Sequence, residues 1–466
     1  MTALTRQTPN APAATRVALA VCVALVAGVI TAWNPIAGVG LLVAGAYTSI
    51  ALRGLETALV MWVPSFFISF FVVGNAWLKG GLAVAVIAAG AAVASQPRLL
   101  RETFDRYGRV LIILAAVLGW FALSAVWAGE ATSAISEWLK VVLCATVFLL
   151  VLLGVRTTRD VRWLLLAFVG AGVFSAVLGM MGVSSGPANP DAAAELAAEG
   201  RITAWAGDPN VLAASLVATA VLALTLASRP SQRGRWALGL CAVIAVAGMA
   251  ATQSRGGLIA GAVALIAGLV LFRRQSARVV PVVVACVIVM FGYFATNPDA
   301  ASRLTESGDA GSGRTELWTV ALRGFRDHPI QGIGLNQFRL ESSRYVLEPG
   351  TLRFVPIISE RPVVVHNTYL QYLVETGLVG IALFLALLAA CARRQLAAAR
   401  RFEAQGMTDD GLLARGVLVA TLATLAAGLF FSAGVDYKTW LLLALGPVLL
   451  HASGRDGALS RGAENR

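Results

Sequence analysis

An arginine that separates two apolar segments is the residue in this sequence whose type and spacing best suit chemistry. Arg255 lies within residues 253–257, followed by Gly256 and Gly257. A guanidinium binds a phosphate through two parallel hydrogen bonds, and glycines let a ligand or another backbone approach closely. The competing interpretation is an interfacial arginine that extends its charged group to water. The placement between apolar segments, with two glycines, favours an anion-binding and catalytic residue.

Arg201 is a second candidate for anion binding, because it precedes a helix start. Asp208 suits a helix cap and Pro209 suits the first helical turn, so residues 201–210 are expected to dock onto the following segment. The alternative is a loop cation that balances nearby glutamates at 195 and 199.

His366 is the candidate general base. It stands directly before Asn367 and Thr368, which are both suitable helix caps. An imidazole beside a helix N-terminus is held in its neutral form, which is the form that accepts a proton. The alternative is a polar residue at the interface. His328, before Pro329, fits a plain helix end as well as a binding role.

The segments around these residues have the composition of membrane spans. The chain has 466 residues, of which 58% are hydrophobic and 13% charged, and soluble domains are less apolar and more charged. A span needs about 20 mostly apolar residues. The sequence predicts an all-α polytopic membrane protein with about 12–14 transmembrane helices, from fourteen candidates: 17–33, 35–52, 57–74, 80–95, 110–128, 138–155, 162–183, 209–228, 236–252, 256–272, 279–295, 370–392, 413–432 and 437–452.

The positive charges predict the orientation of these spans. With the N-terminus in the cytoplasm, 24 of the 37 lysines and arginines fall in cytoplasmic segments and 5 in the short outer segments. This bias favours both termini inside the cell. The net charge of +12 therefore reflects topology, and we expect no nucleic-acid partner. The cysteines lie in apolar segments, so no disulfide framework is indicated.

One long outer loop divides the chain. We expect an N-terminal transmembrane bundle over 1–295, a large periplasmic loop over 296–369, C-terminal transmembrane helices over 370–452 and a cytoplasmic tail over 453–466. Within the loop, 297–313 is expected to be irregular and 348–365 extended. Apolar spacing predicts short amphipathic helices over 314–327 and 335–346.

Motifs in the order Gly207-Asp208-Pro209-Asn210, Ser254-Arg255-Gly256-Gly257, Arg314 to Trp318, His328 to Phe338 and His366 to Gly377 carry a family resemblance. Over about 200–390, the chain resembles the O-antigen ligase and O-antigen polymerase superfamily. The resemblance implies a metal-independent enzyme that takes a glycan from an undecaprenyl diphosphate carrier at the periplasmic face of the bacterial inner membrane. A ligase transfers it to lipid A-core, whereas a polymerase transfers it to another lipid-linked repeat unit.

The resemblance also sets the expected site. It implies catalytic roles for the residues already chosen, His366, Arg255 and Arg201. The candidate substrate-binding residues are Asn210, Ser254, His328, Asn367, Tyr372 and Glu375. The expected partners are the lipid-linked glycan donor, a glycan or lipid A-core acceptor, and membrane lipids.

No metal or other cofactor is expected, because three dispersed histidines and no acidic cluster do not form a metal site. The alternative from another class is a polysaccharide or lipid transporter without catalysis. Its marks are charged or broken helices in the membrane interior, which the sequence does not indicate.

Overall fold

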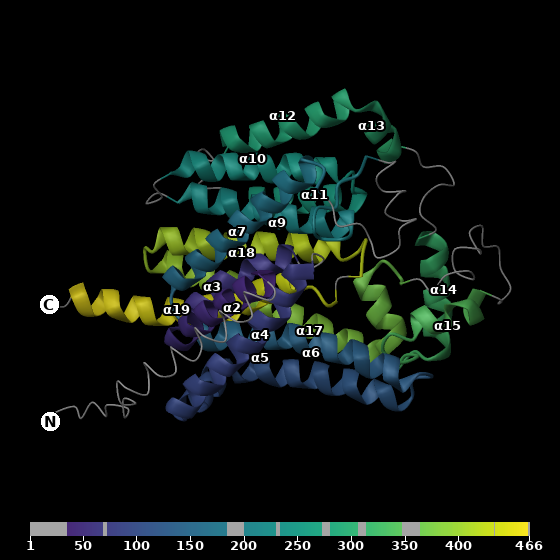
Figure 1. The fold of residues 1–466 in the computed structure, drawn as a ribbon, viewed down its shortest axis with the longest axis horizontal. Coiled ribbons are helices and arrows are strands. Elements are labelled where there is room, and N and C mark those ends of the chain that lie inside the picture. The colour runs from purple at the N-terminus through teal and green to yellow at the C-terminus, as the bar shows by residue number, and fades with distance from the viewer. Residues whose placement is uncertain are drawn as a thin grey trace.

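The computed structural model describes residues 35–68, 72–183, 200–229, 234–272, 280–305, 314–346, 364–432 and 434–464. Every regular element in these ranges is helical, and the long helices lie side by side in one bundle (Figure 1). The expected all-α polytopic membrane fold is confirmed.

The order of elements follows the apolar segments of the sequence closely. The N-terminal half contains α2 (Pro35–Arg53), α3 (Leu55–Trp62), the 3-10 helix η1 (Val63–Phe67), α4 (Val72–Ser95), α5 (Arg98–Leu123), η2 (Ser124–Val126), α6 (Ala131–Gly154) and α7 (Thr158–Met180). The second half contains α9 (Pro209–Ser228), α10 (Arg235–Ala251), α11 (Arg255–Leu271), α12 (Val280–Thr296), α13 (Pro298–Thr305), α14 (Arg314–Asp327), α15 (Phe338–Val346), α17 (Thr368–Ala404), α18 (Thr408–Ala427) and α19 (Tyr437–Glu464).

Within the described residues, seven helices are long and apolar enough to cross a membrane, and four shorter apolar stretches accompany them. Three of the shorter ones, α10, α11 and α12, have 17 residues each and so rise about 26 Å, close to the ~30 Å hydrocarbon core. The first expected span, 17–33, lies outside the described residues.

The expectation of one continuous span over 57–74 is wrong. The α-helix α3 stops at Trp62, and η1 carries the chain from Val63 to Phe67. Pro64 explains the change, because proline lacks the backbone N–H and its ring clashes with the preceding helical turn. The next helix, α4, begins at Val72, so the apolar stretch is shared between two elements.

Helices α9 and α18 form the centre of the bundle. Their most apolar windows are 83% and 78% buried, against 28–44% for the other long spans. Small residues allow this close packing: Gly172 of α7 faces Thr219 of α9, and Gly416 of α18 faces Thr225 of α9. A Cβ at either glycine would overlap the threonine side chain, and small residues are typical of close helix contacts in membranes.

The outer loop contains more helix than expected. The helices over 314–327 and 335–346 are confirmed as α14 and α15, the second beginning at Phe338. Residues 297–313 were expected to be irregular, but Pro298–Thr305 form α13, with Pro298 at its start, where proline is well tolerated. The expected extended stretch 348–365 lies almost entirely outside the described residues.

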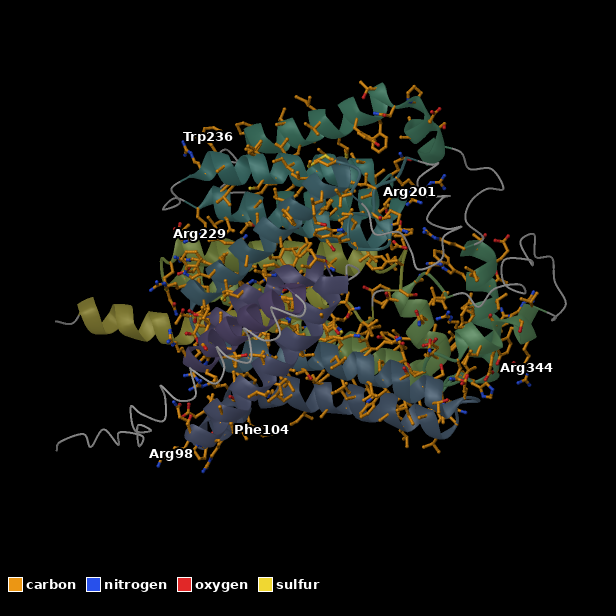
Figure 2. All side chains as sticks on the ribbon, in the orientation of Figure 1. Arg98, Phe104, Arg201, Arg229, Trp236 and Arg344 are labelled. Carbon is orange, nitrogen blue, oxygen red and sulfur yellow. The ribbon has the colours of Figure 1, made fainter. Side chains whose placement is uncertain are left out.

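Labelled arginines mark the two opposite ends of the bundle. Arg98 and Arg229 lie at the left end in Figure 2, whereas Arg201 and Arg344 lie at the right, where α14 and α15 are also found (Figures 1 and 2). Charge counting predicts the cytoplasmic side for the first two arginines and the outer side for the other two, and the side that each end faces stays a prediction. We call the right end the α14 end.

Candidate functional site

The N-termini of α9 and α11 meet at the α14 end of the bundle. Asp208 caps α9, its Oδ1 accepting hydrogen bonds from the backbone of Asn210 at 2.6 Å and Val211 at 3.1 Å. Ser254 caps α11 by accepting from the N–H of Gly257 at 3.1 Å. The Ser254 hydroxyl also donates to Asn210 Oδ1 at 2.7 Å, so this predicted pair joins the two helix starts.

Arg201 docks onto the same place from the preceding loop. Its Nε donates to the carbonyl of Thr252 at 3.0 Å, and the N–H of Ile202 donates to the carbonyl of Ala251 at 3.3 Å. Thr252 is three residues from Arg255, which begins α11 and is exposed. Both predicted arginines therefore stand beside helix N-termini, where backbone N–H groups also favour an anion.

Arg314, the first residue of α14, connects this arginine pair to the outer loop. Burial lowers the pKa of its guanidinium, the charge of Asp208 opposes this, and the charge of Arg255 adds to it. Arg314 therefore lies within electrostatic reach of both residues. From the sequence, Arg314 was expected to start a helix and a family motif but not to be a site residue, because its position beside Arg255 depends on contacts between distant segments.

His366 belongs to the same cluster. Burial lowers the pKa of its imidazole, the positive charge of Arg314 lowers it further, and Asp208 acts in the opposite direction. The imidazole is therefore neutral at neutral pH, which is the form that accepts a proton. Sequence reasoning expected the neutral form from the helix N-terminus, and the structure adds burial and Arg314 as causes. We call Arg201, Asp208, Arg255, Arg314 and His366 the arginine–histidine cluster.

Loop contacts fix the backbone at His366. The indole N–H of Trp318 in α14 donates to the carbonyl of Val365 at 3.2 Å. On the other side, Asn367 caps α17, accepting from Tyr369 at 3.0 Å and Leu370 at 3.1 Å. The observed contacts of Asn367 are thus those of a helix cap, and its substrate-binding role stays a prediction.

The segment between α18 and α19 contacts both the start of α17, next to His366, and the first turn of α11, which begins with Arg255. The N–H of Thr368 donates to the carbonyl of Gly428 at 2.8 Å, and its hydroxyl donates to Phe431 at 2.9 Å. Phe430, between them, packs directly on Gly256 in the first turn of α11. His366 and Arg255 are therefore attached to one connecting segment, although they are far apart in sequence.

Backbone strain gathers at this cluster. Four non-glycine residues among those described have positive φ, and three are in its loops: Ala204 (φ 46°), Gln253 (φ 53°) and His366 (φ 53°). Such conformations cost about 1–3 kcal/mol each and concentrate at functional sites. Gln253 also has a buried Oε1 without a hydrogen-bond partner, and no sequence motif pointed to this residue.

Tyr372 and Glu375 lie in α17 and are fully packed. Tyr372 is 4% exposed, with its ring 4.9 Å from Phe121 and 4.8 Å from Phe384 by centroid. Glu375 is 1% exposed and accepts from the amide of Gln371 at 3.3 Å. Of these contacts, the one between Tyr372 and Phe121 packs α17 against α5, and the predicted substrate contacts of Tyr372 and Glu375 remain predictions.

A break in α17 explains the segment after His328. Gly377 has φ 65° and ψ −170°, so the helix is interrupted there. Residues 328–334 fill the interruption: the N–H of Leu378 donates to Pro329 at 2.9 Å, and that of Gly334 donates to Glu375 at 2.8 Å. His328 itself is exposed, and its carbonyl accepts from Gly332 at 2.9 Å.

This break corrects the expectation that no span is interrupted. Its backbone groups are satisfied by residues 328–334, and the segment docks α14 and α15 onto α17. An apolar cluster strengthens the docking, formed by Leu317, Val320, Ala321, Ile333, Phe338, Tyr345, Val365 and Val374. The break therefore positions the outer helices, which carry Arg314.

No group of three or more His, Cys, Asp or Glu side chains that could hold a metal ion occurs within the described ranges. The cluster instead offers fixed positive charge beside a neutral imidazole. Such an arrangement binds a phosphate group and can accept a proton from a neighbouring hydroxyl.

Comparison with known proteins gives one family match. Residues 240–385 match the family model described as O-antigen ligase. The matched range includes Arg255, Arg314 and His366, and it ends shortly after the break at Gly377. Arg201, Asp208 and Asn210 precede it. No curated protein sequence matches the chain.

Proposed function

We propose that the chain is a glycosyltransferase of the bacterial inner membrane, related to the O-antigen ligases and polymerases, and the match of residues 240–385 to the O-antigen ligase family model supports this. It transfers a glycan from an undecaprenyl diphosphate carrier to an acceptor sugar at the periplasmic face. The ligase reaction, with lipid A-core as acceptor, is the specific proposal. The observation that carries it is the arginine–histidine cluster at one end of the bundle.

The positive charges of the cluster suit the leaving group. In the transfer, an acceptor hydroxyl oxygen attacks the anomeric carbon of the glycan, and the bond from that carbon to the phosphate oxygen breaks. Its electron pair stays on undecaprenyl diphosphate, whose negative charge increases. Arg201, Arg255 and Arg314 stabilise that charge, a role that typically contributes several kcal/mol in a preorganised site.

His366 receives the hydroxyl proton. Its pKa is lowered by burial and by Arg314, so the imidazole is neutral and can act as a base. The acceptor hydroxyl then binds between the imidazole and the anomeric carbon. Since fixed cations carry the charge of the diphosphate, we infer that no metal ion is needed.

The proposed orientation follows from the charge bias. Both termini lie in the cytoplasm, and the α14 end faces the periplasm, where the lipid-linked donor is presented. The division into a bundle over 1–295, a loop over 296–369, C-terminal helices over 370–452 and a tail over 453–466 belongs to this proposal. Residues on the lipid-facing surface border the polyprenyl chain.

The test is transfer by the purified full chain in detergent, with undecaprenyl diphosphate-linked glycan and lipid A-core and without any energy source. We expect glycan-bearing lipid A-core and released undecaprenyl diphosphate, also in the presence of a chelator. Longer lipid-linked glycan formed from donor alone would instead identify a polymerase. Intact donor that is moved across reconstituted vesicles would identify a transporter.

Matched arginine variants connect the activity to the cluster. Arg255→Ala is expected to abolish transfer while the protein remains folded and inserted. Arg344→Ala is the control, since Arg344 is an exposed arginine of the outer helix α15 at the same end of the bundle (Figure 2). If both variants lost the same fraction of transfer activity, the loss would reflect the total positive charge at this end, and Arg255 would not be a specific site residue.

A further inference from the structure

At the end of the bundle opposite α14, three arginines form no ion pair with any residue whose side chain the structure describes. Four arginines near this end form ion pairs: Arg162 with Asp410 at 2.5 Å, Arg229 with Asp409 at 3.4 Å, Arg415 with Glu403 at 2.5 Å and Arg106 with Glu102 at 2.8 Å. Arg393, Arg400 and Arg401 of α17 have no ion pair with any described residue. Their exposed guanidinium groups can therefore contact an anionic ligand.

These three arginines border a shallow, open depression on one face of α17. The hollow is lined by Arg393, Leu396, Ala397, Arg400 and Arg401, which recur at helical spacing. All three arginines and Ala397 are exposed. We call this feature the arginine hollow.

An apolar stripe on the same helix leads to the arginine hollow. Leu378 is 53% exposed and Leu385 is 46% exposed, and Ala382 and Ala386 between and beside them are exposed as well. At helical spacing these positions continue along α17 to Arg393. The exposed face of α17 therefore changes from apolar to basic at one level.

The length of α17 places this change near the membrane surface. The 27 residues after the break at Gly377, 378–404, rise about 40 Å, against about 30 Å for the hydrocarbon core. The basic turns at its C-terminal end therefore reach the headgroup level while the stripe stays among acyl chains. A phospholipid has this same division between an apolar and a charged part.

We propose that the arginine hollow binds the headgroup of an anionic phospholipid, with one acyl chain along the part of the stripe nearest to it, which includes Leu385. Guanidinium groups bind phosphate oxygens in pairs of parallel hydrogen bonds, and basic residues immediately next to a membrane span attract anionic lipid headgroups. The site is separate from the arginine–histidine cluster and does not depend on the proposed reaction.

Native mass spectrometry of the full chain in neutral detergent tests the proposal, with phosphatidylglycerol as the probe and phosphatidylcholine as the comparison. We expect the wild-type chain to retain phosphatidylglycerol at least about tenfold more strongly. Each exposed arginine near anionic lipid contributes roughly fivefold, so the triple variant Arg393→Gln, Arg400→Gln, Arg401→Gln is expected to lose about 100-fold.

The control removes three other exposed arginines of the same end: Arg156→Gln, Arg159→Gln and Arg235→Gln. It is expected to keep lipid binding within about threefold, because its effect is limited to net charge. If the control lost as much phosphatidylglycerol binding as the triple variant, total charge alone would explain the binding, and the proposed site would be refuted. Equal binding of phosphatidylglycerol and phosphatidylcholine by the wild-type chain would also refute the proposal.

Inorganic phosphate distinguishes a lipid from a soluble anion. At equal concentration, phosphate is expected not to displace phosphatidylglycerol, because it has no acyl chain for the apolar stripe. Complete displacement would assign the arginine hollow to a soluble anion and overturn the lipid proposal. Elution of each variant as a single species in neutral detergent confirms that the comparison is made on folded protein.

Discussion

Replacing Gly377 by alanine tests how the outer helices are held in place. A Cβ at this position would overlap the carbonyl of Ile330, and its φ of 65° with ψ of −170° is nearly restricted to glycine. The strain is about 1–3 kcal/mol. Displacing residues 328–334 also loses the hydrogen bonds Leu378 to Pro329 (2.9 Å) and Val379 to Ile330 (3.4 Å), about 1 kcal/mol each.

The strain and the lost hydrogen bonds together are expected to destabilise the native docking of α14 and α15 by about 3–5 kcal/mol. Because Arg314 begins α14, its position beside His366 is lost together with the docking. We expect a lower midpoint of thermal unfolding in detergent, and a transfer rate that falls even at temperatures where the bundle is intact. Proteolysis of the purified variant should become faster in the outer loop.

Gly268→Ala is the matched control. Gly268 lies inside α11 with nothing within 4 Å of an added Cβ, and alanine is the better helix former. Its midpoint and activity are expected to stay at or slightly above the wild-type values. If Gly377→Ala matched this control in both measurements, the docking role of the break would be refuted.

Further variants address the cluster and the topology. His366→Ala should lower the transfer rate by roughly 10²–10⁴-fold with donor binding nearly unchanged, and more than about a tenth of the wild-type rate in His366→Gln would exclude a general base. The rate should fall on acidification as the imidazole gains a proton. Because Arg314 lowers the pKa of His366, Arg314→Gln should raise that pKa and move the acid limb of the pH–rate profile to higher pH. An unchanged acid limb would show that Arg314 does not influence the protonation of His366. Arg255→Lys should retain little activity, since an ammonium lacks the paired donors of a guanidinium, and near-normal transfer would show that charge alone suffices. Reporter fusions after Arg401 should report a cytoplasmic position and fusions after Val346 a periplasmic one, and the reverse result would overturn the site's placement.

Local pattern was sufficient to place most helices. The span expected over 209–228 is α9, and the amphipathic helix expected over 314–327 is α14. Caps such as Asp208 and Ser254 act within three residues, so their function follows from the sequence next to them. The failure over 57–74 also has a local cause, because Pro64 interrupts an otherwise suitable apolar run.

The choice of Arg255, Arg201 and His366 also came from local features: charge beside apolar segments, glycines and helix starts. The structure brings these residues to one end of the bundle, as expected. It also separates them from Tyr372 and Glu375, which follow His366 closely along the chain. Helical geometry carries those two side chains into contacts with neighbouring helices, which the motif alone does not show.

Which distant segments meet depends on the tertiary structure alone. Arg314 joins the cluster because residues 328–334 fill the break at Gly377, and Thr368 is fixed by carbonyls of the connection after α18. The sequence specifies periodicity, caps and charge because these act over a few residues. Contacts between segments tens to hundreds of residues apart depend on the packing of the whole bundle, and no local pattern contains them.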